Sequence, residues 1–189
     1  MSDRSLVDAA LDVIANHGLD GVTVDRLAEA SGISRATLYR RGVAIDELTA
    51  AAVEKAAEQY REALWPALTG PGSAANRLEA ALRALCEAAD QHLALLVGLY
   101  PHPHSPFHEE VDGAALVQEP FAEPFERLLR DGITDGTLRS RDPAADATLL
   151  FNLVSWTYVH LRHAHHWPPE EASTRVVSLV LGGVLRGEN

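Results

Sequence analysis

The sequence predicts an all-α protein of about nine helices, in which an N-terminal three-helix domain with a helix-turn-helix precedes a larger helical domain. Three observations support this fold class. Apolar residues recur at the three- and four-residue spacing of amphipathic helices. Valine and isoleucine do not alternate with polar residues, and we expect no Asn-Gly or Asp-Gly dipeptide to join two strands. Glycines and prolines divide the chain into segments of helical length.

The three N-terminal helices are predicted from their caps. Ser5, Thr23 and Ser34 suit N-cap positions, because their hydroxyls can accept a hydrogen bond from a free backbone N–H of the first turn. A glycine follows each segment and favours the end of a helix. We expect these helices at residues 5–17, 23–31 and 34–41. The glycine turn between the second and the third helix forms a helix-turn-helix pattern.

Prolines help to set the bounds of the remaining helices, which we expect at 46–65, 75–92, 93–100, 111–131, 143–165 and 169–186. Pro66 should end the first of these helices, because proline cannot donate the hydrogen bond of a helix interior. Pro120 and Pro124 should kink or split the helix at 111–131. Pro143 suits a first helical position, with Asp142 as its cap.

Composition and charge narrow the classes of function. The chain has 189 residues, 47% hydrophobic and 23% charged, which allows a buried core in each of two domains, at residues 1–46 and 47–189. Its net charge of −11 argues against a protein that coats nucleic acid with its whole surface. The single cysteine, Cys86, excludes an internal disulfide and a cysteine zinc cluster. No secretory signal or apolar run of membrane length is visible, so we expect a cytoplasmic protein. We also expect no cofactor.

Positive charge is concentrated on the third helix and its exit. Three arginines and no acidic residue lie between Ser31 and Ile45, whereas residues 1–48 as a whole carry a net charge of −3. A major groove admits one helix, whose side chains read base edges or contact phosphates. Arg35 is a candidate to read a guanine, and Ala36 or Thr37 to touch a thymine methyl group. The candidate DNA-binding residues are Thr23, Ser34, Arg35, Ala36, Thr37, Tyr39, Arg40 and Arg41.

The helix-turn-helix segment at residues 23–39 reads Thr-Val-Asp-Arg-Leu-Ala-Glu-Ala-Ser-Gly-Ile-Ser-Arg-Ala-Thr-Leu-Tyr. It resembles the DNA-binding segment of TetR-type transcriptional regulators. The resemblance implies a non-enzymatic homodimer that binds a palindromic double-stranded DNA operator, usually as a repressor released by a small-molecule effector. It also implies that the larger domain binds the effector and dimerises. Two positions depart from the family pattern, since Gly42 and Ile45 stand where an aromatic residue and a phosphate-binding lysine are usual, and Arg40 and Arg41 can replace that charge.

Two sets of residues in the larger domain are candidates for these implied functions. An effector pocket is mostly apolar with a few polar groups, and its candidates are Leu82, Cys86, Tyr100, Phe121, Phe125, Asn152 and Trp156. An apolar stripe on the last two helices, with Gly182-Gly183 allowing close approach, suits a four-helix bundle between two subunits. The interface candidates are Leu149, Leu153, Val176, Val177, Val180, Leu181 and Val184. Ordinary core packing is the alternative for both sets, and for the Asn152 amide we favour a satisfied polar group of the core over a ligand contact.

Two groups of histidines raise the question of a metal or of pH sensing. They are His102, His104 and His108 in one group, and His160, His163, His165 and His166 in the other. Neither group includes a cysteine or a His-Glu-x-x-His motif, so we expect no metal site. Two alternatives to a DNA-binding regulator remain open: a helical protein-interaction module with a degenerate DNA motif, and a histidine-based metal-dependent enzyme.

Overall fold

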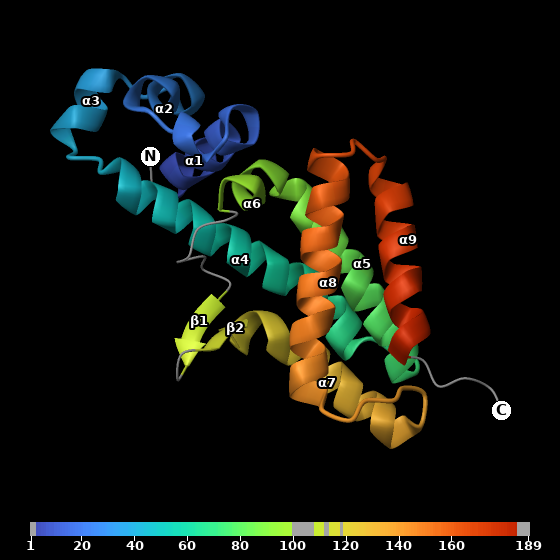
Figure 1. The fold of residues 1–189 in the computed structure, drawn as a ribbon. Helices are drawn as coiled ribbons and strands as arrows, with labels where there is room; N and C mark the ends of the chain where they lie inside the picture. Colours follow the sequence, from blue (N-terminus) through green and yellow to red (C-terminus); the bar gives the residue numbers. More distant parts are fainter. Residues whose placement is uncertain (1–2, 100–107, 112–113, 118, 185–189) are drawn as a thin grey trace. The chain divides into compact units, whose positions relative to one another are not determined.

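The computed structural model describes residues 3–99, 108–111, 114–117 and 119–184 (Figure 1). Within these ranges it contains nine α-helices, one short 3-10 helix and one two-stranded antiparallel hairpin. The chain divides into two compact units. The first unit comprises residues 1–59 and 92–101, and the second comprises residues 60–91 and 102–189. The helical fold class predicted from the sequence is confirmed.

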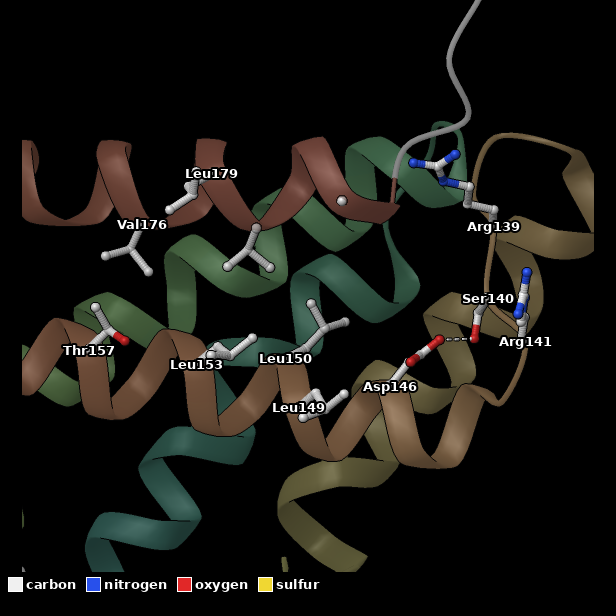
Figure 2. A pocket seen from close by; sticks show the side chains of 12 residues that line it. Arg139, Ser140, Arg141, Asp146, Leu149, Leu150, Leu153, Thr157, Val176 and Leu179 are labelled. Atoms are coloured by element: carbon white, nitrogen blue, oxygen red, sulfur yellow. Dashed lines mark hydrogen bonds between the residues drawn. The ribbon is translucent and has the colours of Figure 1, made fainter.

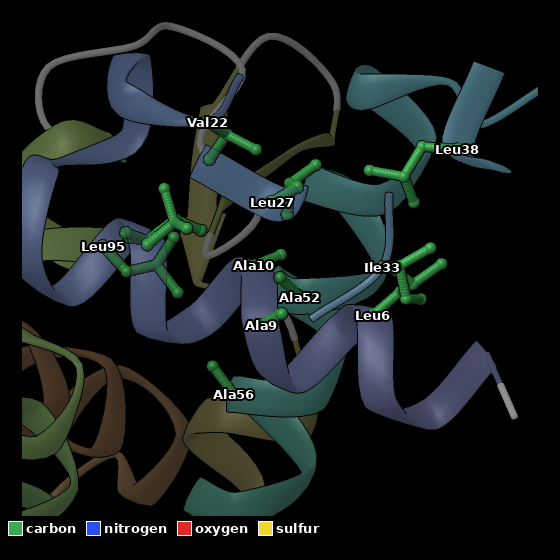
Figure 3. Close-up of a cluster of buried hydrophobic side chains, with 12 residues drawn as sticks. Leu6, Ala9, Ala10, Val22, Leu27, Ile33, Leu38, Ala52, Ala56 and Leu95 are labelled. Carbon is green, nitrogen blue, oxygen red and sulfur yellow. The ribbon is translucent and has the colours of Figure 1, made fainter. Parts of the chain in front are cut away.

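The first unit contains the helix-turn-helix. Its elements are α1 (Asp3–His17), η1 (Leu19–Gly21), α2 (Val24–Ser31), α3 (Arg35–Arg40), the first part of α4 (Ile45–Thr69) and α6 (Leu93–Leu99). Side chains from these helices converge on one apolar core (Figure 3). Leu27 of α2 and Leu38 of α3 are almost fully buried in it. Helix α2 therefore packs against α1, and α3 packs against α2, through their apolar faces.

The predicted caps of α2 and α3 are confirmed. The Thr23 hydroxyl oxygen accepts a hydrogen bond from the Arg26 N–H at 3.3 Å, and the Ser34 hydroxyl oxygen accepts one from the Thr37 N–H at 3.3 Å. Gly32, between them, has a φ of 67°, a conformation that glycine adopts without a steric penalty. The predicted cap of α1 is wrong, because this helix begins at Asp3 and includes Ser5. Serine is tolerated inside a helix, so its hydroxyl alone does not mark the first turn.

The second unit is built around α5 (Ala74–Gln91). This helix packs against α7 (Glu119–Asp135), α8 (Pro143–His163) and α9 (Pro169–Val184). The last part of α4 also belongs to this unit. The predicted cap of α8 is confirmed, since the Asp142 carboxylate accepts a hydrogen bond from the Ala145 N–H at 3.2 Å. No helix in the described ranges combines the length and the apolar composition that crossing a bilayer demands.

Two predicted helix bounds in this part of the chain are wrong, and one predicted split does not occur. Helix α4 continues through Pro66 to Thr69, because the lost hydrogen bond is outweighed by burial of Leu64 and Ala67. The predicted helix at 111–131 is replaced in its first part by strands β1 (His108–Val111) and β2 (Ala114–Val117). Helix α7 then runs through Pro124 without a split. The strands flank the sequence Asp112-Gly113, a dipeptide typical of hairpin loops that we did not expect to join strands.

Candidate nucleic-acid interface

The exposed face of α3 gathers most of the predicted DNA-binding residues. Leu38 anchors the helix in the core, with 1% of its surface exposed, and the residues around the other side of the helix face solvent. Tyr39 is 71% exposed, although tyrosine carries a large apolar ring. Thr37 is half-buried, and the other predicted residues are exposed, namely Thr23, Ser34, Arg35, Ala36, Tyr39, Arg40 and Arg41.

Three of the predicted residues also hold the local structure. The hydroxyls of Thr23 and Ser34 cap α2 and α3. The Ser34 and Thr37 hydroxyl oxygens lie 2.9 Å apart, so one donates a hydrogen bond to the other. These hydroxyls keep only part of their hydrogen-bonding capacity for a base or a phosphate. Their first role is to fix the N-terminal turn of each helix.

The arginines of the helix-turn-helix differ in their partners. The Arg35 Nε lies 2.8 Å from Oδ1 of Asp25, an ion pair between α3 and α2. The Arg26 Nη1 donates a hydrogen bond to the Gly21 carbonyl oxygen at 2.9 Å, which ties α2 to η1. For Arg40 and Arg41 no ion pair occurs with any residue that the structure describes. These two guanidinium groups are the ones best placed to pair with phosphates.

The two departures from the family pattern have structural consequences. Gly42 has a φ of 63° and follows the end of α3. Ile45 begins α4 and packs, partly buried, against the core of the first unit. An isoleucine held in this way contributes no charge at the protein surface. The exposed positive charge at the exit of α3 is therefore that of Arg40 and Arg41.

A groove runs between α8 and α9 in the second unit (Figure 2). It has a volume of about 750 Å³. Its walls are mainly apolar, and Arg139 and Arg141 lie at one end, beside a hydrogen bond from Ser140 to the Asp146 carboxylate. Leu149, Leu153 and Leu179 are 56%, 52% and 82% exposed. The groove is lined by Arg139, Ser140, Arg141, Asp146, Leu149, Leu150, Leu153, Thr157, Val176, Leu179, Val180 and Gly183.

The groove brings together four of the predicted interface residues, Leu149, Leu153, Val176 and Val180. Val176, Val177 and Leu181 are buried in this chain, with 6%, 0% and 6% of their surface exposed, so Val176 only borders the groove and none of the three presents much area to a partner. The side chain of Val184 lies outside the described part of the chain. A Cβ at Gly182 or Gly183 would meet open space, which means that packing within the chain does not demand glycine there. Leu179, which was not among the interface candidates, is the most exposed large apolar side chain among those described.

The effector candidates that the structure describes all belong to the second unit. Leu82, Cys86, Phe121 and Phe125 are buried, and none of the candidates lines the groove. The Asn152 amide donates a hydrogen bond to the Thr148 carbonyl oxygen of its own helix at 2.9 Å, and Tyr100 lies outside the described residues. Burial raises the pKa of the Cys86 thiol to about 11, which keeps it protonated at neutral pH.

Tyr60 is a buried aromatic residue that sequence reasoning missed. Its hydroxyl donates a hydrogen bond to the Phe121 carbonyl oxygen at 3.0 Å. Its ring centroid lies 5.4 Å from that of Phe121 and 6.3 Å from that of Phe151. Burial raises the pKa of the Tyr60 hydroxyl. The apolar spacing along α4 gave a possible signal for this residue, but not for its partners on α7 and α8.

Two of the described histidines, His160 and His165, form a pair. The Nε2 atoms of His160 and His165 lie 3.2 Å apart, and the two rings meet edge to face. In the described ranges, no group of three or more histidine, cysteine, aspartate or glutamate side chains is arranged to hold a metal. His102, His104 and the side chain of His108 lie outside those ranges.

Two family models match the chain. Residues 6–52 match the bacterial regulatory proteins of the tetR family. Residues 71–184, more than half of the chain, match the tetracyclin repressor-like C-terminal domain. The chain belongs to the tetR family. This tetR-family chain is a DNA-binding regulator rather than an enzyme, and the resemblance predicted from residues 23–39 is confirmed.

Solved structures share the fold of this tetR-family chain. A TetR/AcrR-family regulator from Thermobifida fusca is 20% identical, with a TM-score of 0.72 over 96% of this chain and 98% of that one. FadR from Bacillus subtilis in complex with stearoyl-CoA is 16% identical, with a TM-score of 0.71 over 96% and 99%. AibR in complex with isovaleryl coenzyme A and operator DNA is 17% identical, with a TM-score of 0.67 over 94% and 96%. Among curated proteins, no sequence matches the chain.

Proposed function

We propose that this tetR-family regulator is a homodimeric repressor that leaves a palindromic operator when a small-molecule effector binds. The observation that carries the proposal is the exposed surface of α3, where Tyr39, Arg40 and Arg41 face solvent while Leu38 fixes the helix in the core. An exposed helix with this charge fits the major groove of DNA. The negative charge of the chain as a whole limits binding elsewhere on its surface.

Exposed side chains of α3, and of Arg41 just after it, have distinct parts in the proposed contact. Arg40 and Arg41 pair with phosphates, which position the protein without reading sequence. In this proposal the Tyr39 hydroxyl contacts the phosphate backbone of the DNA as well. Arg35 and the Ala36 methyl group reach base edges. The departure from the family pattern at Ile45 is then compensated by the two arginines.

The second copy required by a palindrome docks, in this proposal, on the groove between α8 and α9. Exposed leucines on both walls form an apolar surface, and removing this surface from water is favourable. Two copies that meet through the same face bury these side chains on both sides, as a two-fold axis requires. The dimer holds two recognition helices about 34 Å apart, one turn of DNA.

The effector is proposed to bind in the second unit and to act by shifting a population. An effector that favours a different spacing of the recognition helices weakens operator binding by its difference in affinity for the two states. FadR with stearoyl-CoA and AibR with isovaleryl coenzyme A make acyl-CoA thioesters the first effectors to test. Such a regulator works in the cytoplasm, where its operator lies.

Gel-shift titration with the DNA upstream of the protein's own gene tests the proposal. We expect a retarded complex that is competed weakly by a scrambled duplex of equal length. Stearoyl-CoA and isovaleryl-CoA are then added to the complex, with free coenzyme A as the matched control. Equal binding to the specific and scrambled duplexes contradicts the proposed function and favours a protein-interaction module.

A further inference from the structure

We infer that Asp25 is a specificity-determining residue, which orients the Arg35 guanidinium so that its free edge reads a guanine. The inference rests on the proposed function, because it concerns the same DNA contact. Asp25 is the second residue of α2 and Arg35 is the first residue of α3. The ion pair between them therefore connects the two helices of the motif at their N-terminal ends.

The atom that makes the contact determines which edge of Arg35 remains free. Oδ1 of Asp25 lies 2.8 Å from Nε, the nitrogen next to the aliphatic part of the arginine side chain. Within the described parts of the chain, the terminal nitrogens Nη1 and Nη2 donate no hydrogen bond, so their donors remain available to a base. The edge formed by these two nitrogens matches the O6 and N7 acceptors of guanine, which it can engage with two parallel hydrogen bonds.

Fixing the guanidinium has an energetic consequence for recognition. The side chains of Arg35 and Asp25 are 65% and 62% exposed, so packing does not restrict the arginine. A free arginine on this surface would sample many orientations and lose that freedom on binding a base. The ion pair holds Nε before DNA binds, in an orientation that presents the terminal edge. Less conformational entropy is therefore lost when that edge contacts a base.

The Asp25 carboxylate also opposes binding that does not depend on sequence. Its negative charge offsets that of Arg35 and repels nearby phosphates, which carry most of the attraction to random DNA. A base contact by the terminal edge leaves the ion pair intact. The pair therefore weakens non-specific binding more than it weakens binding to a site with guanine at the right position.

A structural role of Asp25 predicts different behaviour. An acidic residue in the first turn of α2 interacts favourably with the helix dipole, and this effect would stabilise the fold without changing base preference. Glu29 offers a matched control, because it lies one turn further along α2, is exposed, and has no ion pair with any described residue. Replacing either acid with its amide changes the net charge equally.

The test is selection from a library of duplexes with a randomised central segment, followed by sequencing. The chains compared are the wild type, D25N, E29Q, R35A and the double variant D25N/R35A. In the wild type we expect a guanine preference of about tenfold at one position of each half-site. R35A should abolish that preference, D25N should reduce it several-fold, and E29Q should preserve it. D25N and E29Q should both raise affinity for random duplexes.

The outcomes separate this inference from the proposed function. A wild type that enriches no sequence contradicts the proposed function, and the inference with it. A wild type that enriches a palindrome, with the same base preferences in D25N as in E29Q, overturns the inference alone. In the R35A background, a D25N change that still alters the guanine position also overturns it, because Asp25 would then act on that base without Arg35.

Discussion

Oδ1 of Asp90 accepts a hydrogen bond from the Arg162 Nε at 2.5 Å, and the Tyr158 hydroxyl donates to the same oxygen at 3.2 Å. Arg162 also donates from Nη1 to the Trp167 carbonyl oxygen at 2.5 Å, in the turn between α8 and α9. One carboxylate therefore joins α5 to α8, and through Arg162 to the turn that precedes α9. These contacts hold the helices that line the groove.

Replacing Asp90 with Asn should lower the free energy of unfolding of the second unit by about 1–2 kcal/mol. The amide keeps the shape of the side chain but loses its charge. The Arg162 and Asp90 side chains are 20% and 31% exposed, so water screens only part of the interaction. Urea denaturation followed by circular dichroism measures the change.

The matched control is Glu171→Gln, which removes the charge of the exposed pair between Glu171 and Arg175 on α9. An exposed pair of this kind contributes about 0.3–0.5 kcal/mol, so this variant should unfold almost like the wild type. Equal effects of the two substitutions would mean that the Asp90 carboxylate does not tie α5 to α8.

Replacing Arg40 or Arg41 with Ala should weaken DNA binding by a similar factor for every sequence. Each arginine that pairs with one phosphate contributes about one unit to the slope of log affinity against log salt. The slope should therefore fall by about one for each variant, with unchanged thermal unfolding. Filter binding or fluorescence anisotropy between 50 and 300 mM salt, a range of about sixfold in concentration, measures it.

Arg61→Ala is the control, since it removes an exposed arginine from the second unit. It should leave the salt slope unchanged. Should all three variants alter the slope equally, the basic exit of α3 would have no special part in phosphate binding.

Local signals made the helix-turn-helix predictable. The hydroxyls of Thr23 and Ser34 accept hydrogen bonds from residues only three positions further along, so the sequence contains both partners within one turn. The exposed surface of α3 follows from the same periodicity that buries Leu38.

Contacts between distant segments were not predictable in this way. At the start of α5 the Ser73 hydroxyl forms a local cap with the Asn76 N–H, but the Asp135 carboxylate also accepts a hydrogen bond from the Ala74 N–H, at 2.8 Å and across 61 residues. The ion pair of Asp25 with Arg35 depends on the angle between two helices, which periodicity does not specify. Strand β2 reads Ala-Ala-Leu-Val, a sequence that fits a helix as well as a strand. Pro66 does not end α4, because burial of Leu64 and Ala67 stabilises the helix around it. That burial depends on tertiary packing, which the local sequence does not specify.

Acidification below about pH 6.5 should destabilise the first unit through His92. Burial lowers the pKa of this imidazole below its ordinary value, and its Nε2 is buried without a hydrogen-bond partner among the described residues. Above pH 6.5 the side chain is neutral in both states, and its contribution to stability is complete. As the pH falls, the unfolded chain takes up a proton before the folded chain does, so unfolding becomes more favourable until the folded pKa is passed.

Denaturant unfolding of wild type and H92Q between pH 8 and pH 5 measures this effect, with both pH limits chosen to bracket the ordinary histidine pKa of about 6.5. Below pH 6.5 the free energy of unfolding of the wild type should fall relative to that of H92Q. Other titrating groups are common to both chains and cancel in the difference. A difference that is constant across this range would show that His92 titrates alike in the folded and unfolded states.

Replacing Leu153 or Leu179 with Arg should separate the two subunits of the proposed dimer. Both leucines lie on the open groove, so the substitutions leave the core of a single chain intact. In the dimer the arginine would be buried in an apolar seam without a partner, which is costly. Sedimentation velocity should show monomers. DNA affinity should fall at least about tenfold, because a single helix-turn-helix reads only one half-site.

Ile133→Arg is the matched control. Ile133 on α7 is a large apolar residue that is 44% exposed, yet it does not line the groove. The same change of charge and size there should leave both the dimer and DNA binding unaltered. If L153R and L179R remain dimeric and bind DNA like I133R, the two subunits meet through another face. If they become monomeric but keep full affinity, the DNA affinity of this regulator does not depend on a fixed spacing of two recognition helices.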